Sequence, residues 1–342
     1  MGEAISVAVV GVGYWGANVA RNLDALDGCE LSWCCDTDPG RLEPLRDRFS
    51  AARLTTDLDE LLADERLDAV AVATPVADHA ETARRVLEAG KHCFVEKPLA
   101  RRGGEARALC GLAAERERLL MVGHLLEFHP GIEALRRLLV AGELGDVHYI
   151  HSQRLNLGKL RADENALWSL GAHDVSVALA LTGEFPAEVA ARGESYVRDG
   201  VEDVVFAFLR FPSGVVAHLH LSWLDPHKER RLTVVGSRRM ASFDDMAGER
   251  KLTVFDKGFD PEAGSPDDYV ARSGDAWSPE VGDEEPLRLE LAHFVECVRE
   301  GSRPRSDGES GLRVVTVLGA LQYSLEDGGA PVRLTELQGV PA

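Results

Sequence analysis

The sequence predicts two domains, an α/β domain built on a doubly wound parallel sheet and a C-terminal α+β domain with an open, largely antiparallel sheet. A chain of 342 residues is long enough for two ordinary domains. Short apolar runs alternate with helical patterns up to residue 122, and longer strand-like stretches follow. We place the domains at residues 1–123 and 124–342 and expect the last helices to pack back towards the first domain.

The first domain alternates between two kinds of segment. Short apolar runs predict strands at Ile5–Val10, Glu30–Cys35, Ala69–Ala73, His92–Val95 and Leu119–Val122. Helical segments lie between them at Trp15–Leu26, Arg41–Phe49, Asp78–Ala89 and Gly104–Glu117. Nearly continuous apolar strands separated by helices predict a parallel sheet that is covered on both faces.

The second domain has longer strands and fewer helices. After a helix at Gly131–Ala141, strands are predicted at Val147–Asn156, Glu188–Tyr196, Asp203–Phe211, Val215–Trp223 and Arg231–Val235. Along Val215–Trp223, His218 and His220 alternate with apolar residues, which is typical of a half-exposed antiparallel strand. The acidic segment Lys257–Glu285, rich in Pro and Gly, is interpreted as a long loop. Helices are expected at Pro286–Glu300 and Gly311–Glu326.

Composition narrows the classes of partner and compartment. With 38 basic and 57 acidic residues the net charge is -19, which disfavours nucleic acid as a partner. No apolar run approaches the roughly 20 residues of a membrane-spanning helix, so we expect no membrane association and a cytoplasmic location. The six cysteines form no Cys-x-x-Cys pair, and we expect neither a disulfide framework nor a bound metal.

The pattern Gly11-x-Gly13-x-x-Gly16 follows the first strand and opens the first helix. A pyrophosphate needs backbone N–H groups at a helix N-terminus, with no side chain blocking its approach. Asp36 ends the second strand, where a carboxylate accepts hydrogen bonds from ribose hydroxyls. The pattern predicts a Rossmann domain that binds a dinucleotide, and the alternative is a turn that serves packing alone.

Asp36 also bears on the identity of the cofactor. Its carboxylate would repel a 2′-phosphate on the ribose, and the next two residues, Thr37 and Asp38, supply no cation. Arg41 is the nearest basic residue that follows, and it belongs to the next predicted helix. The sequence therefore favours NAD over NADP.

Two further motifs follow predicted parallel strands. Thr74-Pro75, with His79, follows the third predicted strand, and Glu96-Lys97-Pro98 follows the fourth. Ligands of doubly wound sheets bind at the carboxyl ends of the strands. Lys97 could reach a substrate oxygen there, although an exposed loop lysine is the ordinary alternative.

Together these motifs resemble the Gfo/Idh/MocA family of NAD(P)-dependent oxidoreductases. The resemblance rests on Gly11-Val12-Gly13-Tyr14-Trp15-Gly16, Thr74-Pro75 with His79, Glu96-Lys97-Pro98 and Gly171-Ala172-His173-Asp174. It implies that Lys97 polarises the reacting hydroxyl or carbonyl and that Glu96 positions the cofactor. Thr74 and Pro75 would line the nicotinamide with His79 supporting their loop, and Tyr14 and Trp15 of the turn belong to the same cofactor site.

The resemblance also implies that His173 is the proton relay. Imidazole, with an ordinary pKa of about 6.5, suits that role near neutrality. A buried histidine with satisfied hydrogen bonds is the alternative. Inositol dehydrogenases of the family place an aspartate four residues before this histidine, where Ser169 stands here. Asp174 could support His173 instead, and the pattern is more similar to the nucleotide-sugar 3-dehydrogenases of the family.

Candidate substrate contacts precede the histidine. Arg154, Asn156 and Lys159 could hold sugar hydroxyls and a diphosphate, because arginine matches phosphate oxygens. The alternative for this segment, which also contains Gln153, is a solvated strand end. Trp168 could stack on a sugar ring or fill the core.

The function we expect is NAD-dependent hydride transfer at a secondary alcohol or ketone of a sugar, in particular C3 of a nucleotide-linked sugar. A glycosidase that retains NAD and oxidises C3 transiently would use the same motifs, and a dehydrogenase of free sugars or cyclitols is a further alternative. A non-catalytic sensor of NAD is disfavoured by the intact lysine and histidine motifs. The resemblance also implies a homodimer or homotetramer formed through the C-terminal sheet.

Overall fold

A computed structural model describes residues 4–158, 160–161, 164–262 and 265–334. The described residues form two compact units, one of residues 4–128 and 284–316, the other of residues 129–283 and 317–334. Helix α8 (Pro286–Glu300) lies in the first unit, and α9 (Gly308–Glu326) begins in the first unit and ends in the second. The first unit therefore includes residues 284–316, which follow most of the second unit along the chain.

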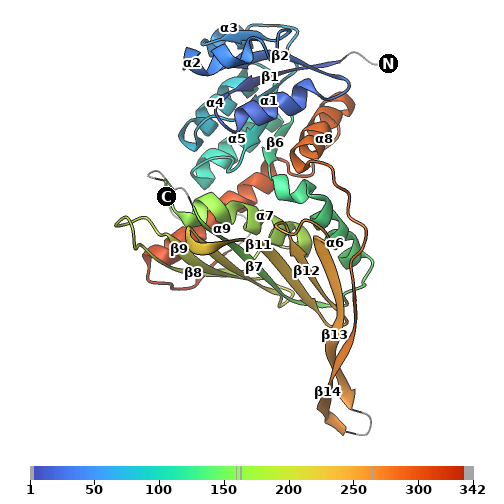
Figure 1. Ribbon diagram of the computed structural model, residues 1–342. Helices are drawn as coiled ribbons and strands as arrows, with labels where there is room; N and C mark the ends of the chain where they lie inside the picture. The colour runs from blue at the N-terminus through green and yellow to red at the C-terminus, as the bar shows by residue number, and fades with distance from the viewer. Residues whose placement is uncertain (1–3, 159, 162–163, 263–264, 335–342) are drawn as a thin grey trace. The chain divides into compact units, whose positions relative to one another are not determined.

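The first unit contains a parallel sheet with strand order β3-β2-β1-β4-β5-β6 among its described residues (Figure 1). Its strands are β1 (Ile5–Val10), β2 (Cys29–Cys35), β3 (Arg53–Thr55), β4 (Ala69–Val72), β5 (His92–Glu96) and β6 (Leu120–Gly123). Its other helices are α1 (Gly16–Asp24), α2 (Pro39–Leu42), α3 (Leu58–Leu62), α4 (Val76–Glu88) and α5 (Gly103–Glu115). Helix α4 packs against α5, and α1 packs against α8. The doubly wound parallel sheet is confirmed.

The short elements of this unit differ from the prediction. The helix predicted at Arg41–Phe49 is instead α2 followed by a 3₁₀ turn at Glu43–Leu45. Pro44 within that turn has no N–H for a continuing α-helix. Strand β3 and helix α3 were not predicted, because three and five residues are too few to establish a period.

The second unit contains a mixed sheet with strand order β14-β13-β12-β11-β7-β10-β9-β8-β15 among its described residues. Its strands are β7 (Val147–Leu157), β8 (Glu188–Glu194), β9 (Val204–Arg210), β10 (Val216–Ser222), β11 (Leu224–Gly236), β12 (Met240–Asp244), β13 (Leu252–Glu262), β14 (Ser265–Trp277) and β15 (Val332–Arg333). Helices α6 (Pro130–Val140) and α7 (Ala172–Thr182) lie over one face (Figure 1). The largely antiparallel sheet is confirmed.

Strand β10 shows how the sheet is mixed. It runs antiparallel to β9 and parallel to β7. Ala217, Leu219 and Leu221 are buried, whereas His218 and His220 are half-buried on the other face, so the predicted alternation is confirmed. Ser222, the next residue on the face of His218 and His220, is buried at the end of the strand.

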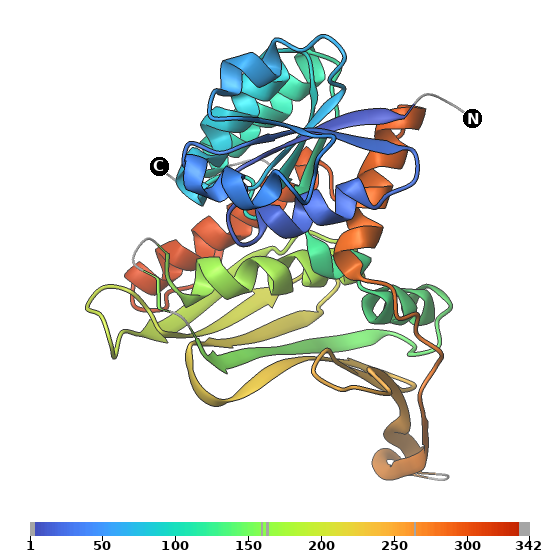
Figure 2. The same cartoon turned by 45° about the horizontal axis from the view of Figure 1, so that its top comes forward.

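The long loop predicted at Lys257–Glu285 is wrong up to Trp277, and only residues 278–285 lie outside strands and helices as predicted. Strands β13 and β14 pair as a long hairpin that extends away from the rest of the second sheet (Figures 1 and 2). Arg272 on β14 forms ion pairs with Asp256 and Asp260 on β13. Because neither face of most of the hairpin is buried, its strands have little apolar alternation, and charged, Pro and Gly residues are tolerated there.

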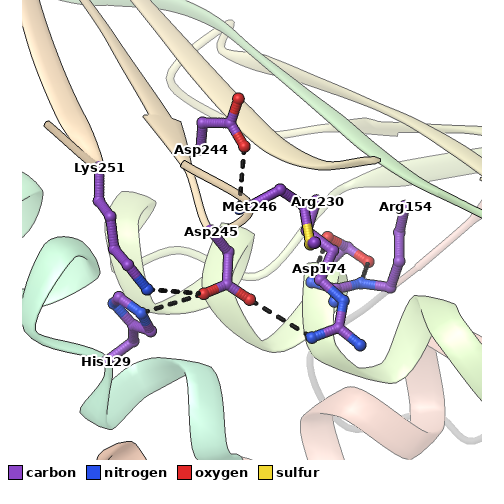
Figure 3. Close-up of polar contacts among 8 residues, drawn as sticks. All are labelled: His129, Arg154, Asp174, Arg230, Asp244, Asp245, Met246 and Lys251. Carbon is purple, nitrogen blue, oxygen red and sulfur yellow. Dashed lines mark hydrogen bonds and ion pairs between the residues drawn. The ribbon is translucent and has the colours of Figure 1, made fainter. Parts of the chain in front are cut away.

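Asp245 joins three elements of the second unit (Figure 3). Its Oδ1 lies 3.2 Å from Nε2 of His129, which precedes α6, and 3.4 Å from Nζ of Lys251. Its Oδ2 lies 3.4 Å from Nη1 of Arg230 on β11. The hydrogen bond from His129 and the nearby positive charges hold the pKa of Asp245 well below its usual range. A carboxyl group whose pKa is lower in the folded state than in the unfolded state stabilises the fold at a pH above its unfolded-state pKa, which is about 3.9 for aspartate. This stabilisation is lost as the pH falls through the folded-state pKa.

We predict that Asp245→Asn lowers the free energy of unfolding of the second unit by about 1–3 kcal/mol at neutral pH. The reason is that His129, Arg230 and Lys251 remain in place while the carboxylate that pairs with them is removed. The difference from wild type should shrink as pH falls below about 4. Urea unfolding over a pH series measures both effects. Asp244→Asn is the control, since Asp244 pairs with the more exposed Arg231. An equal difference at every pH would contradict this account.

Among the described residues, no helix has both the length and the apolar character needed to cross a membrane.

Candidate active site

The glycine-rich turn connects β1 to α1. Gly11 has φ +86°, and a Cβ there would lie 2.7 Å from the backbone of Ala73. A Cβ on Gly16 would lie 1.8 Å from the carbonyl oxygen of Gly11. Both glycines are therefore required by packing within the unit.

Gly13 is different. The nearest described atom to a Cβ on Gly13 would be Nη1 of Arg41, at 3.6 Å, which is an ordinary contact. Within the described residues no side chain caps α1, and no acidic residue lies in its first turn. The positive end of the helix dipole is thus left for an anion, and the absence of a side chain on Gly13 lets a pyrophosphate approach. These observations fit a dinucleotide better than a turn that serves packing alone.

Asp36 is held close to this turn. Its Oδ2 accepts a hydrogen bond from the Val12 amide at 2.9 Å, and its Oδ1 accepts one from the Asp38 amide at 3.0 Å. Nη1 of Arg41 lies 3.5 Å from Asp36 Oδ2, so the arginine of the following helix reaches back to the carboxylate. Arg41, which the sequence placed in the next helix, is thus a cation beside the Asp36 carboxylate.

His79 connects the two loops that follow β4 and β5. Its Nδ1 lies 2.8 Å from the Pro98 carbonyl oxygen, and its Nε2 lies 2.9 Å from the Thr74 carbonyl oxygen. Burial lowers the pKa of His79, and the two carbonyl contacts act in the opposite direction. The Thr74 hydroxyl is buried and has no hydrogen-bond partner among the described residues, which leaves it for a polar group of a bound cofactor. Pro75 lies between these contacts, directly before α4.

Glu96 connects β5 to the glycine-rich turn. Its Oε1 accepts a hydrogen bond of 2.5 Å from Nε1 of Trp15, and its Oε2 accepts one of 3.3 Å from the Lys97 amide. Gly123 is its neighbour on β6, and a Cβ there would lie 3.1 Å from Oε2. Burial raises the pKa of Glu96 to about 7. Glu96 therefore contacts both the glycine-rich turn and the backbone of Lys97. Tyr14, in the same turn, is 90% exposed.

Three buried groups of the first unit were not predicted. His124 follows β6, and both of its ring nitrogens lack a hydrogen-bond partner among the described residues. Burial and the charge of Lys97 lower its pKa to about 3. Glu127 and Glu290 are buried as well. The positions of His124 and Glu127 just after a parallel strand, and of Glu290 on the apolar face of a helix, are the signals that could have revealed them.

In the second unit, His173 and Asp174 lie in the first turn of α7. Both oxygens of Asp174 accept hydrogen bonds. Oδ2 accepts one of 2.7 Å from Nε of Arg154, and Oδ1 accepts one of 3.2 Å from Nη2 of Arg154 (Figure 3). Oδ1 also accepts one of 2.6 Å from the Ser152 hydroxyl. These bonds fix the start of α7 on β7. His173 is half-buried, and Ser169 lies on the π-helical turn Leu167–Gly171 that leads into α7.

The predicted substrate residues of the second unit are only partly brought together. Arg154 and Asn156 lie two residues apart on β7, and Arg154 contacts α7 through Asp174. Gln153 lies at the alternate register position and on the opposite face. Trp168 is half-buried, and its amide donates to Asn165 Oδ1 at 3.2 Å. Lys159 lies outside the described residues.

Two family models match the chain. Residues 5–124 match that of the GFO_IDH_MocA oxidoreductase family with an NAD-binding Rossmann fold, and residues 132–242 match that of the GFO/IDH/MocA C-terminal domain.

Individual relatives are also similar. UDP-N-acetylglucosamine 3-dehydrogenase of Acidithiobacillus ferrooxidans is 30% identical over 93% of this chain and 96% of its own. A solved structure of that enzyme covers 95% of this chain and 98% of its own at 29% identity, with a TM-score of 0.81. GenD2 from gentamicin A biosynthesis, solved in complex with NAD, has a TM-score of 0.82 at 28% identity and covers 98% of this chain and 97% of its own. The 2,7-anhydro-N-acetylneuraminate hydratase of Escherichia coli is 28% identical over 63% of this chain and 61% of its own.

Proposed function

Since the chain belongs to the Gfo/Idh/MocA family of oxidoreductases and its cofactor is NAD, we propose that it transfers hydride between NAD and C3 of a nucleotide-linked sugar. The observation that carries this proposal is the similarity to UDP-N-acetylglucosamine 3-dehydrogenase, which extends over 93% of the chain and thus over both units. Bound NAD supplies the hydride acceptor in the oxidative direction and the donor in the reductive direction.

The proposed roles follow from the chemistry of each side chain. The ammonium of Lys97 polarises the reacting hydroxyl or carbonyl oxygen, and His173 takes the hydroxyl proton or returns it. Asp174 is assigned a positioning role, because its carboxylate is already engaged by Arg154 and Ser152 and fixes the turn that carries His173. Gly11, Gly13, Tyr14, Trp15, Gly16, Asp36, Thr74, Pro75, His79 and Glu96 form the proposed cofactor site.

We assign the substrate to Arg154, Asn156, Lys159 and Trp168. The Nη1 nitrogen of Arg154 makes no hydrogen bond within the described part of the chain, so the guanidinium can still donate to a phosphate or a sugar oxygen. Asn156 supplies an amide that suits sugar hydroxyls, and Trp168 supplies a ring face for stacking.

The proposal is tested by incubating the protein and NAD with nucleotide sugars, free sugars, inositols and glycosides, and by measuring products by mass. A keto sugar nucleotide formed together with NADH is the expected result. Oxidation of inositols or free sugars alone would instead make the protein a cyclitol or sugar dehydrogenase.

A second candidate is an elimination or hydrolysis that oxidises the substrate only transiently and retains NAD. It is favoured by the similarity to 2,7-anhydro-N-acetylneuraminate hydratase, which covers 63% of this chain. The same assay separates the two functions, because a rearranged or cleaved product without net NADH supports only the second.

We place a homo-oligomeric interface on the face of the second sheet opposite α6 and α7. Tyr149, Phe206 and Phe208 are 47%, 42% and 49% exposed on this face. They are joined by His151, His218 and His220, with Phe206 stacked on His220 at 4.4 Å between ring centroids. An aromatic patch of this kind on a flat sheet fits a second copy of the same chain as homodimer or homotetramer.

We predict that Phe208→Asp shifts the protein to a smaller assembly, because the introduced carboxylate would be desolvated in the interface. Light scattering after size-exclusion chromatography measures the mass. Val140→Asp, at a 79% exposed apolar position on α6, is the control and should not change it. An unchanged mass for Phe208→Asp would place the interface elsewhere.

A further inference from the structure

A buried acidic residue of the first unit has no role in the proposed reaction. Glu290 on α8 is 0% exposed, and neither of its carboxyl oxygens has a hydrogen-bond partner among the described residues. It lies on the apolar face of α8 that also carries Leu287, Leu291 and Phe294. A buried carboxyl group without partners is costly when ionised, so its presence on a core face calls for a reason.

The packing of α8 directs Glu290 towards Glu96. Phe294, one helical turn after Glu290, packs its ring at 5.7 Å from that of Phe94 on β5. Glu96 follows Phe94 by two residues and so lies on the same face of the sheet. Glu290 precedes Phe294 by four residues and so lies on the same face of the helix. Both residues therefore lie on the faces through which α8 and β5 pack together, and Glu96 is among the charged groups that act on Glu290.

Helix α8 packs against α1, β1 and the short helix Leu125–Phe128, and of these only β1 carries no charged residue. The short helix Leu125–Phe128 packs against α8 and carries the buried Glu127. Arg21 on α1 pairs with Glu285, which directly precedes α8, with Nη2 2.6 Å from Oε1. The charge of Arg21 is therefore already balanced by Glu285. The positive charge that reaches the pair is that of Lys97, which favours the ionised form of Glu96.

These surroundings determine the protonation of the pair. Burial, together with the neighbouring Glu96 and Glu127 carboxylates, raises the pKa of Glu290 well above its usual range. Burial raises the pKa of Glu96 to about 7. Two buried carboxyl groups that repel one another in this way cannot both ionise readily, so the pair holds at least one proton at neutral pH.

We propose that Glu96 and Glu290 form a proton-exchanging pair behind the cofactor site, and that binding of the oxidised cofactor expels protons from it whereas binding of the reduced cofactor does not. This inference rests on the NAD-dependent function proposed above. The nicotinamide ring is cationic in NAD and neutral in NADH, and Glu96 is hydrogen-bonded to Trp15 at the start of α1, within the cofactor site. A cationic nicotinamide ring beside Glu96 favours ionisation of the Glu96–Glu290 pair. When the ring is reduced and becomes neutral, this effect is lost and the pair favours its protonated form.

The pair also affects the proton balance of turnover. Oxidation of a secondary alcohol transfers one hydrogen with two electrons to NAD as hydride and releases the hydroxyl hydrogen as a proton. When the cofactor becomes neutral, the Glu96–Glu290 pair takes up a proton. Fewer protons then leave the protein during hydride transfer than the reaction itself releases.

Calorimetric titration of the whole protein with NAD and with NADH tests the proposal without any sugar. Titrations in buffers of different ionisation enthalpy give the number of protons exchanged. We expect NAD to release up to about one proton more than NADH near pH 7, where Glu96 titrates, and again at a higher pH, where Glu290 titrates. Glu96→Gln should remove most of the release near pH 7. Glu290→Gln, which mimics the protonated acid, should keep the release near pH 7 and remove the release at higher pH.

Matched variants separate protonation from structure. Glu290→Asp should restore the release at higher pH, and Glu296→Gln, at an exposed site on the same helix, should behave as wild type. Equal proton exchange for NAD and NADH in the wild-type protein would overturn the proposal, as would a release at higher pH that is unchanged in Glu290→Gln. If NAD binds as proposed here but the sugar assay fails, the function proposed above fails and this inference stands. Absence of NAD binding contradicts both.

Discussion

Lys97→Met is expected to lower kcat by about 10³-fold while changing the affinity for NAD less than tenfold. The loss follows from removing the positive charge that polarises the reacting oxygen, an electrostatic contribution typically of about 10²–10³ in rate. Lys97 directly follows Glu96, whose carboxylate binds Trp15 of the glycine-rich turn, and this supports the proposal that its ammonium acts at the cofactor site. Methionine keeps the length of the side chain and removes only the charge.

Steady-state kinetics and NAD titration measure the two effects separately. Lys228→Met, at an exposed position on β11, is the control and should leave both quantities unchanged. If Lys97→Met weakened NAD binding as strongly as it lowered kcat, Lys97 would be a cofactor ligand rather than a polariser of the substrate.

His173→Ala is expected to lower kcat by about 10²–10³-fold, the usual contribution of a general acid or base. Its effect on NAD affinity should be much smaller, because NAD binding is assigned to the first unit and His173 lies on α7 of the second. The acid limb of the pH–rate profile should also disappear, since the group that must be deprotonated for alcohol oxidation is gone. His148→Ala, at an exposed position on β7, is the control. An unchanged kcat would remove His173 from the mechanism.

Asp174→Asn distinguishes a positioning role from a direct one. Asparagine can still accept a hydrogen bond from Ser152 but loses the charge that binds Arg154. We expect a smaller loss of kcat than in His173→Ala, with a rise in KM as Arg154 is released. A loss as large as that of His173→Ala, without a change in KM, would show that Asp174 itself takes part in proton transfer.

The sequence was most informative where the determining contacts are local. Strand β1 and the glycines after it were located correctly, because one short segment combines an apolar run with a turn that tolerates no side chain at Gly11 and Gly16. The parallel sheet followed from apolar strands covered on both faces. The β13–β14 hairpin was missed because its two strands pair with each other and most of their side chains face solvent. Such strands do not show the apolar alternation from which strands were predicted.

Long-range pairings could not be predicted from spacing. Trp15 and Glu96 are 81 residues apart, and each was assigned to the cofactor site without the hydrogen bond between them. Arg154 and Asp174 were assigned to substrate and catalysis, and only the fold shows that they bind one another. Glu290 and Glu96 are 194 residues apart in the sequence (290 minus 96). A role for the buried acidic residue Glu290 can be proposed only because the fold packs α8 against β5.

The most direct test of hydride transfer from C3 is an isotope measurement. The protein would be incubated with NAD and UDP-N-acetylglucosamine that carries deuterium at C3, and the reduced cofactor would be analysed by mass. The account predicts that the NADH formed carries the deuterium and that the sugar nucleotide is recovered as its 3-ketone. Unlabelled NADH, or a product that is cleaved or rearranged without any NADH, would contradict it.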